Sequence, residues 1–416
     1  MHRVTSASIF ALSLAFAAGP SMAAEWDVRV GGEFVSYFGY ASSDVSTDPS
    51  VDFDGFDVKS DVTIAFSPEI TLENGLQFGA VVELDGQEGN IGDSFLFIDS
   101  SGGTVEFGSR PSAGYNMFYS APDESILGTN DGSSGDFIPF DEEAGSALVG
   151  NDTGLGTLNS TFIENGANAN DNADRINYYT PRIAGFQLGV SYARDPNASS
   201  NAQVDITAAG GLHDLFDVGL NYVAEFGDVG VAVAGRWGIA SLEGSAAVAG
   251  SSGLVVDGTG ATVVRATTAD VQATDTVVLA PVDAVAAGQS SNPTILGFGA
   301  NVSYGGFTIG GSWAEQNDTV LSDGQAFDVG VSYATGPWAV SFTYQYGQNV
   351  DDELANGSDE ELQQFVAGVT YELAEGVAVG GFAAYVDFDE EFSDDGTAGG
   401  DDVDGFIIGG GVALEF

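Results

Sequence analysis

The last eleven residues of this chain alternate between two kinds of side chain up to the final residue. One parity is apolar apart from a glycine and ends on an aromatic residue: Phe406, Ile408, Gly410, Val412, Leu414 and Phe416. The other parity consists mostly of small residues and ends at Glu415. This period is typical of a β-strand with one apolar face and one small or polar face. A buried terminal strand of a soluble sandwich would show the same pattern, so the segment predicts a strand and leaves its surroundings open.

Similar alternating segments fill most of the chain, and the connections between them are of two lengths. Short turns are expected at residues 67–75, 100–103, 181–185, 226–228, 304–306, 334–337 and 373–376. Longer connections, rich in Asp, Gly, Asn and Ser, are expected at residues 42–56, 86–92, 110–173, 194–214, 241–293, 316–324, 348–360 and 389–404. Seven turns and eight loops join sixteen antiparallel strands.

The difference in connection length indicates a class of all-β protein. Beyond the N-terminal region no apolar run reaches the roughly 20 residues of a spanning helix, so a membrane form would cross with strands. Membrane barrels keep the turns at one end short and the loops at the other end long. Trp26 and Trp338 fall at the expected turn end, and Trp237 and Trp313 fall near the loop end, as in an aromatic girdle. We predict an all-β, 16-stranded antiparallel transmembrane β-barrel that forms a single domain over residues 24–416.

The N-terminal residues and the overall charge narrow the choice of compartment and partner. Arg3 precedes an apolar stretch at 9–18, and residues 21–23 form a cleavage site with small residues, so residues 1–23 are expected to be a signal peptide. An exported chain without cysteine has no disulfide framework. With 9 Lys and Arg against 61 Asp and Glu, the net charge of -52 excludes nucleic acid as a partner and disfavours docking on anionic lipid.

Four segments carry motifs that are moderately specific one by one and specific in combination. They are residues 67–79 (SPEITLENGLQFG), 104–110 (TVEFGSR), 175–192 (RINYYTPRIAGFQLGVSY) and the closing strand that ends on Phe416. Together they resemble the Gram-negative general porin family, most of all its alphaproteobacterial type. The resemblance implies the bacterial outer membrane, a homotrimer, and a third loop, here residues 110–173, that folds into the barrel as the constriction. Two features depart from the family: the external loop at 241–293 is unusually long, and the third loop lacks a Pro-Glu-Phe-Gly-Gly tip.

A function follows from this architecture. A barrel of about sixteen strands is wide enough for a water-filled channel, so we expect passive diffusion of ions and small hydrophilic solutes through an outer-membrane porin. The excess of acidic residues predicts a preference for cations. The resemblance implies that a basic wall faces an acidic loop at the narrowest point, although such charges could also merely neutralise one another. The predicted pore residues are Arg29, Lys59, Arg110, Arg236, Asp136, Asp141, Glu142 and Glu143.

Two other functions stay open from the sequence. In a solute-selective channel the aromatic residues of the third loop would line the pore rather than anchor the loop to the wall; anchoring is the expected role. These residues are Tyr115, Phe118, Tyr119, Phe137 and Phe140. A calcium-binding extracellular adhesin would also be acidic, but tandem Gly-Gly-x-Gly-x-Asp repeats are absent. Acidic segments at 351–353, 359–361, 389–391 and 401–402 offer oxygen ligands for calcium, and no other cofactor is expected.

Enzymatic activity is not expected. After removal of residues 1–23 the single histidine is His213, and the chain has no Gly-x-Ser-x-Gly motif. A nucleophile with a general base is therefore missing from the sequence pattern.

The loop at 241–293 leaves the strand number open. Residues 253–256, 262–264 and 276–279 favour β-structure and would form either an external hairpin or an extra pair of spanning strands. Sixteen strands is the prediction and eighteen the alternative.

Overall fold

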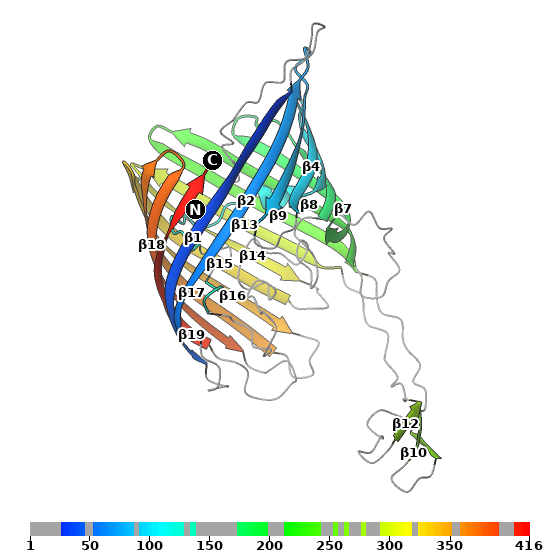
Figure 1. Cartoon of the computed structure of the whole chain (residues 1–416). Helices are drawn as coiled ribbons and strands as arrows, with labels where there is room; N and C mark the ends of the chain where they lie inside the picture. Colours follow the sequence, from blue (N-terminus) through cyan, green and yellow to red (C-terminus); the bar gives the residue numbers. More distant parts are fainter. Residues whose placement is uncertain are drawn as a thin grey trace.

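The computed structural model describes most of the chain as one closed antiparallel barrel of sixteen strands, β1 to β9 and β13 to β19 (Figure 1). The described residues are 26–45, 53–86, 91–128, 134–138, 173–198, 212–242, 253–256, 262–265, 276–279, 292–317, 323–351, 358–390 and 403–416. The barrel confirms the predicted fold class and strand number. Within the described residues, no helix is long and apolar enough to cross a membrane.

The barrel strands follow one another around the ring in chain order. The first nine are β1 (Asp27–Val45), β2 (Gly55–Thr71), β3 (Gln77–Asp85), β4 (Ile91–Ser100), β5 (Gly103–Ser109), β6 (Ala173–Tyr179), β7 (Phe186–Ala198), β8 (Leu212–Phe226) and β9 (Val229–Leu242). The others are β13 (Thr294–Tyr304), β14 (Phe307–Asn317), β15 (Asp323–Thr335), β16 (Trp338–Asp351), β17 (Ser358–Ala374), β18 (Val377–Glu390) and β19 (Val403–Glu415).

The two ends of the barrel sheet close on each other through the last residue of the chain. β19 pairs with β1 over thirteen residue pairs, from Glu33 opposite Glu415 to Val45 opposite Val403. Beyond the strand, the Phe416 N–H donates to the Gly32 carbonyl at 3.0 Å, and the Gly32 N–H donates to the Phe416 carbonyl at 2.9 Å. The terminal strand therefore leaves no free edge in the ring, because its hydrogen bonds continue to the final residue.

Six of the seven short turns lie where they were predicted, and the first is shifted. It was expected at 67–75, but β2 continues to Thr71 and β3 starts at Gln77. Pro68 stays within β2 opposite Val28 of β1, while the pairing of β2 with β3 passes from Phe66 directly to Glu69. Proline lacks an N–H, so it fits where one neighbour does not need that donor. Reading Pro68 as part of the turn was therefore wrong.

The loop at 241–293 contains a small sheet instead of spanning strands. β10 (Gly253–Val256) lies between β11 (Thr262–Arg265) and β12 (Thr276–Leu279), and these three strands form a sheet of their own. Each has four residues, far fewer than the roughly 9–11 of a membrane-spanning strand. The eighteen-strand alternative was therefore wrong, and the hairpin alternative missed the third strand.

The strands of the barrel have two faces of different chemistry. On β19, Phe406 and Ile408 are exposed, as is Phe416 directly after the strand, whereas Ile407 on the other parity is buried. We call the side that carries the exposed large hydrophobic residues the apolar face, and the opposite side the polar face. Trp26 and Trp338 are 56% and 51% exposed at the turn end. This is the distribution of an aromatic girdle on a hydrophobic belt.

Candidate functional site

The described residues of the third loop, 110–128 and 134–138, form hydrogen bonds with side chains on the polar face of successive strands, among them β7 and β8. A short helix, α1 (Ala113–Asn116), is capped by Ser112, whose Oγ accepts from the Tyr115 N–H. The Ala113 N–H donates to Ser191 Oγ on β7 at 2.6 Å, and the Gly114 N–H donates to Asp217 Oδ1 on β8 at 2.6 Å. Side chains of the wall therefore satisfy N–H groups that a one-turn helix leaves free.

The next part of the loop is held by β13 and β15 in the same manner. Asn301 Nδ2 on β13 donates to the Ser120 carbonyl at 3.1 Å. The Ala121 N–H donates to Asp328 Oδ2 on β15 at 3.0 Å. These contacts join residues that are 181 and 207 positions apart in the chain. The course of the loop thus depends on the register of the whole barrel.

The described loop residues then pass β16 and β17 and reach β1. The Glu124 N–H donates to Ser341 Oγ on β16 at 2.8 Å, and Ser134 Oγ donates to Gln364 Oε1 on β17 at 2.9 Å. Tyr37 Oη on β1 donates to Asp136 Oδ2 at 2.6 Å. We call the polar face of β6–β9 and β13–β19 the loop-bearing wall, since the described loop residues are attached along it except for Asp136, which contacts Tyr37 on the adjacent β1.

Glycines on the loop-bearing wall allow the loop backbone to approach closely. A Cβ atom on Gly299 would lie 1.7 Å from the Tyr119 carbonyl oxygen, and one on Gly368 would lie 2.5 Å from Ser125 Cα. Any larger residue at these positions would push the loop away from the wall. The small side chains of this parity are therefore part of a seat for the loop.

A buried ion pair fastens the beginning of the loop. Arg236 on β9 and Asp217 on β8 are 4% and 2% exposed, and Arg236 Nε donates to Asp217 Oδ2 at 2.8 Å. The same guanidinium donates from its NH2 group to Ser112 Oγ at 3.2 Å. Asp217 thus accepts from both the wall and the Gly114 N–H. Breaking such a pair from one side would leave a buried charge without its partner.

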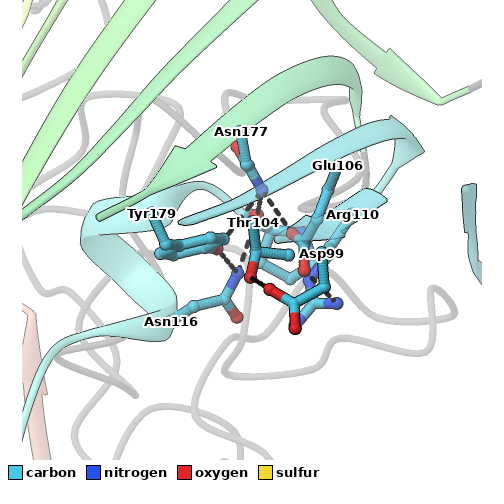
Figure 2. Close-up of polar contacts among 8 residues, drawn as sticks. Asp99, Thr104, Glu106, Arg110, Asn116, Asn177 and Tyr179 are labelled. Carbon is cyan, nitrogen blue, oxygen red and sulfur yellow. Dashed lines mark hydrogen bonds and ion pairs between the residues drawn. The ribbon is translucent and has the colours of Figure 1, made fainter. Parts of the chain in front are cut away.

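Arg110 lies in a polar cluster where the chain leaves β5 (Figure 2). Its NH1 group is 3.0 Å from Glu106 Oε1, and its guanidinium lies 4.2 Å from the centre of the Phe95 ring. Asn177 Nδ2 on β6 donates to Glu106 Oε2 at 3.2 Å and to the Pro111 carbonyl at 3.0 Å. The cluster orients the first residues of the third loop relative to β5 and β6.

The two remaining predicted basic residues lie on β1 and β2. Arg29 is near the first short turn and forms ion pairs with Asp27 and Glu69. Lys59 Nζ is 2.8 Å from Asp57 Oδ2 and 5.8 Å from the centre of the Phe137 ring. All four predicted basic residues therefore have a partner among the acids of the strands. The predicted arrangement, in which they face loop acids at one constriction, stays a prediction.

The predicted loop acids divide between described and undescribed residues. Asp136 accepts from Tyr37. Asp141, Glu142 and Glu143 lie outside the described residues, as does Phe140. Phe137 packs against Tyr37 and Phe382, with ring centres 5.9 Å and 6.4 Å apart, so this aromatic residue contacts the wall.

The polar face of β1–β5 differs sharply from the loop-bearing wall, and we call it the acidic wall. The strand registers place nine acidic residues on this one face: Asp27, Glu33, Asp57, Asp61, Glu69, Glu83, Asp85, Asp99 and Glu106. The basic residues there are Arg29 and Lys59, with Arg110 just beyond β5. Sequence reasoning missed this grouping, although period-2 parity combined with consecutive antiparallel pairing would have found it.

Other functional candidates were missed as well. Arg175 on β6 is buried on the polar face, and Asp217 and Asp328 accept N–H groups of the loop. In Glu124, burial raises the pKa of the carboxyl, and the adjacent Asp123 carboxylate raises this pKa further. Among the described residues, no group of three or more acidic, His or Cys side chains is arranged to hold a metal ion. Of the acidic segments considered for calcium, 401–402 lies outside these residues, 351–353 and 389–391 lie partly outside them, and 359–361 belongs to β17.

Comparison with known proteins assigns the family. A sequence profile described as Gram-negative porin matches residues 10–391. The chain belongs to the Gram-negative porin family. It is therefore an outer-membrane β-barrel, whose apolar face contacts lipid and whose polar face encloses the lumen. No curated protein matches the chain.

Solved porins and channels share the fold of this porin at low sequence identity. The anion-selective porin from Comamonas acidovorans is 16% identical, with a TM-score of 0.55 over 94% of this chain and 100% of that chain. The outer membrane channel DcaP of Acinetobacter baumannii is 12% identical, with a TM-score of 0.54 over 96% and 100%. OmpT of Vibrio cholerae, in its trimer form, is 14% identical, with a TM-score of 0.52 over 94% and 99%.

Proposed function

We propose that this porin is a passive, non-enzymatic channel for ions and small hydrophilic solutes, and that it prefers cations. The observation that carries the preference is the acidic wall. Nine carboxylate positions there face the lumen together with three basic residues. A low-dielectric tube with such an excess of negative charge concentrates cations.

The third loop supplies the size limit in this proposal. Its residues from Ser120 to Glu124 are attached to β13, β15 and β16, which lie on either side of β14, and β14 is half-way around the ring from β3 in the acidic wall. A solute would pass between the loop on one side and the carboxylates on the other. The attachment of Gly114, Ala121 and Asp136 to the wall supports a fixed constriction rather than a swinging flap.

Ion preference has to come from the side chains, because the fold is compatible with either sign. The Comamonas acidovorans protein is an anion-selective porin and shares the barrel architecture. At 16% identity its wall charges do not transfer to this chain. In this proposal the acidic wall is therefore the feature that makes the channel prefer cations over anions.

Liposome swelling with a series of neutral sugars of increasing size tests the passive-diffusion part of the proposal. Swelling should be fast for the smallest sugars and fall steeply with size, without saturation as concentration rises. Vesicles that do not swell in any sugar would reject a general diffusion pore. Saturation with one sugar alone would indicate a channel selective for that solute.

We also propose a homotrimer. The Vibrio cholerae OmpT structure of the same fold is a trimer form, and β3–β6 have only 7 to 10 residues while β1 has 19. A part of the barrel wall that is built from short strands and has an exposed apolar face is suited to contacts between neighbouring barrels. Light scattering of the detergent complex, corrected for bound detergent, should give three chains per particle, and a mass of one chain would contradict the proposal.

A further inference from the structure

A pocket of about 370 Å³ lies where the described tip of the third loop meets the ends of β1 and β2. Its volume falls within the range of roughly 300–1,000 Å³ that is typical of small-molecule sites. Ala41 and Lys59 contribute from the strands, and Asp136 and Phe137 contribute from the loop. Phe53 and Asp54, which precede β2, complete this side of the pocket.

The pocket already holds an ammonium group of the protein itself. Lys59 Nζ lies 2.8 Å from Asp57 Oδ2 and 5.8 Å from the centre of the Phe137 ring. A carboxylate beside an aromatic face is the combination that proteins use to bind ammonium ions. The interactions that Lys59 makes in the pocket are therefore those that an ammonium group of a solute could make there.

The charged side chains that line the pocket give it a net negative charge. Asp54, Asp57 and Asp136 contribute three carboxylates, and Lys59 contributes one positive charge. Asp54 Oδ1 accepts from the Ser43 N–H at 2.7 Å, and Asp136 Oδ2 accepts from Tyr37 at 2.6 Å. These bonds fix the orientation of the two carboxylates, and a carboxylate oxygen can accept more than one hydrogen bond.

We propose that this pocket is a subsite for small organic ammonium ions passing through the pore. The solute would place its cationic group between the carboxylates and its carbon atoms against the rings of Phe53 and Phe137. Lys59 competes for the same position and keeps the affinity low, so that the solute is released again. This inference rests on the proposed cation-preferring channel and specifies which cations dwell in it.

Block of the potassium current by choline provides the test, measured on the full-length mature protein in planar bilayers. Choline added to one side should interrupt the current in a saturable manner. Lys59→Met removes the competing cation and should lower the half-blocking choline concentration by about tenfold, whereas Asp57→Asn removes a carboxylate and should raise it by about tenfold. The double variant K59M/D57N, which keeps the net charge of the pocket, should fall between the two single variants.

Glu83→Gln is the matched control, because it removes one negative charge from the acidic wall outside the pocket. It should shift the reversal potential in a salt gradient and leave choline block unchanged. Equal half-blocking concentrations for the wild type, K59M and D57N would overturn the subsite, as would equal effects of D57N and E83Q. A channel that prefers cations but shows no choline block would refute this inference alone, whereas an anion-preferring channel would refute the proposed function itself. Heat-modifiable migration in detergent gels verifies that each variant is folded.

Discussion

The two walls of this barrel are built from the same alternating strands and differ in what their polar faces carry. The acidic wall, on β1–β5, has long charged side chains such as Lys59, Glu83 and Glu106. The loop-bearing wall has glycines and short hydroxyl or amide side chains, such as Gly299, Ser341 and Asn301, where the third loop is attached. A surface that receives a backbone needs small residues and hydrogen-bonding partners, while a surface that faces water and ions can carry charge.

Charged side chains on the two walls also have different roles. On the loop-bearing wall, the carboxylates of Asp217 and Asp328 accept hydrogen bonds from N–H groups of the loop. On the acidic wall, Arg29 and Lys59 each pair with neighbouring acids and remain partly exposed. Loss of the first kind of charge should alter the structure of the pore, and loss of the second kind should alter its selectivity.

The largest effect is expected from Arg236→Met on the loop-bearing wall. This change leaves the buried Asp217 carboxylate without its ion pair, which costs about 3–5 kcal/mol. The beginning of the third loop should detach, so that single-channel conductance increases and becomes heterogeneous. Arg29→Met is the control, because a partly exposed pair contributes only about 0–1 kcal/mol. Equal conductance histograms for R236M and R29M would contradict the assigned anchoring role.

A smaller structural effect is expected from Gly299→Val. Its side chain would collide with the Tyr119 carbonyl, since a Cβ there lies 1.7 Å from that oxygen. Overpacking of this kind costs about 1–3 kcal/mol, and the loop should shift toward the lumen and reduce the swelling rate of liposomes in the larger permeant sugars. Gly235→Val is the control, because the nearest atoms to its Cβ lie 3.5 Å away on the apolar face. If both variants swell alike, the glycines do not form a seat.

On the acidic wall, the double variant D61N/E83Q should change selectivity without changing pore size. Two unit charges 4 Å apart interact by about 1 kcal/mol in water, so the permeability ratio of potassium to chloride should fall by up to about fivefold. Asp404→Asn, an exposed position on the apolar parity of β19 near the loop end, should have a smaller effect. Reversal potentials in a potassium chloride gradient give both ratios. A larger effect of D404N would place the selective charge outside the lumen.

The smallest effect concerns pH. Because burial and Asp123 raise the pKa of Glu124, this carboxyl takes up its proton at a higher pH than an ordinary glutamate. Cation preference should therefore begin to fall, as pH is lowered, at a higher pH than it would with an ordinary glutamate at this position. Glu124→Gln should remove that first step from a plot of reversal potential against pH. A wild-type plot identical to that of E124Q would show that the charge of Glu124 does not contribute to the electrostatic potential in the pore.

Much of this architecture could be predicted from sequence, and the limits of prediction have a physical cause. Alternation and turn residues are local signals, so the sequence predicts sixteen strands and six of the seven turns. Pro68 was wrongly assigned to a turn, because whether a strand can contain a proline depends on which neighbouring strand needs its N–H. The contacts Gly114 to Asp217 and Ala121 to Asp328 span 103 and 207 residues. No local pattern encodes such pairs, since they arise from the accumulated register of the ring. The structure places Arg29, Lys59 and Arg236 on the polar face, but their wall partners, such as Glu69 for Arg29, could be recognised only after the register was known.

The sign of the reversal potential in a potassium chloride gradient tests the central claim most directly. The purified wild-type porin in a neutral-lipid bilayer should show a potential of the sign set by potassium, and its size should decrease at high salt as the screening length falls from about 10 Å to about 3 Å. A potential of the sign set by chloride, or a potential that D61N/E83Q leaves unchanged, would contradict the account.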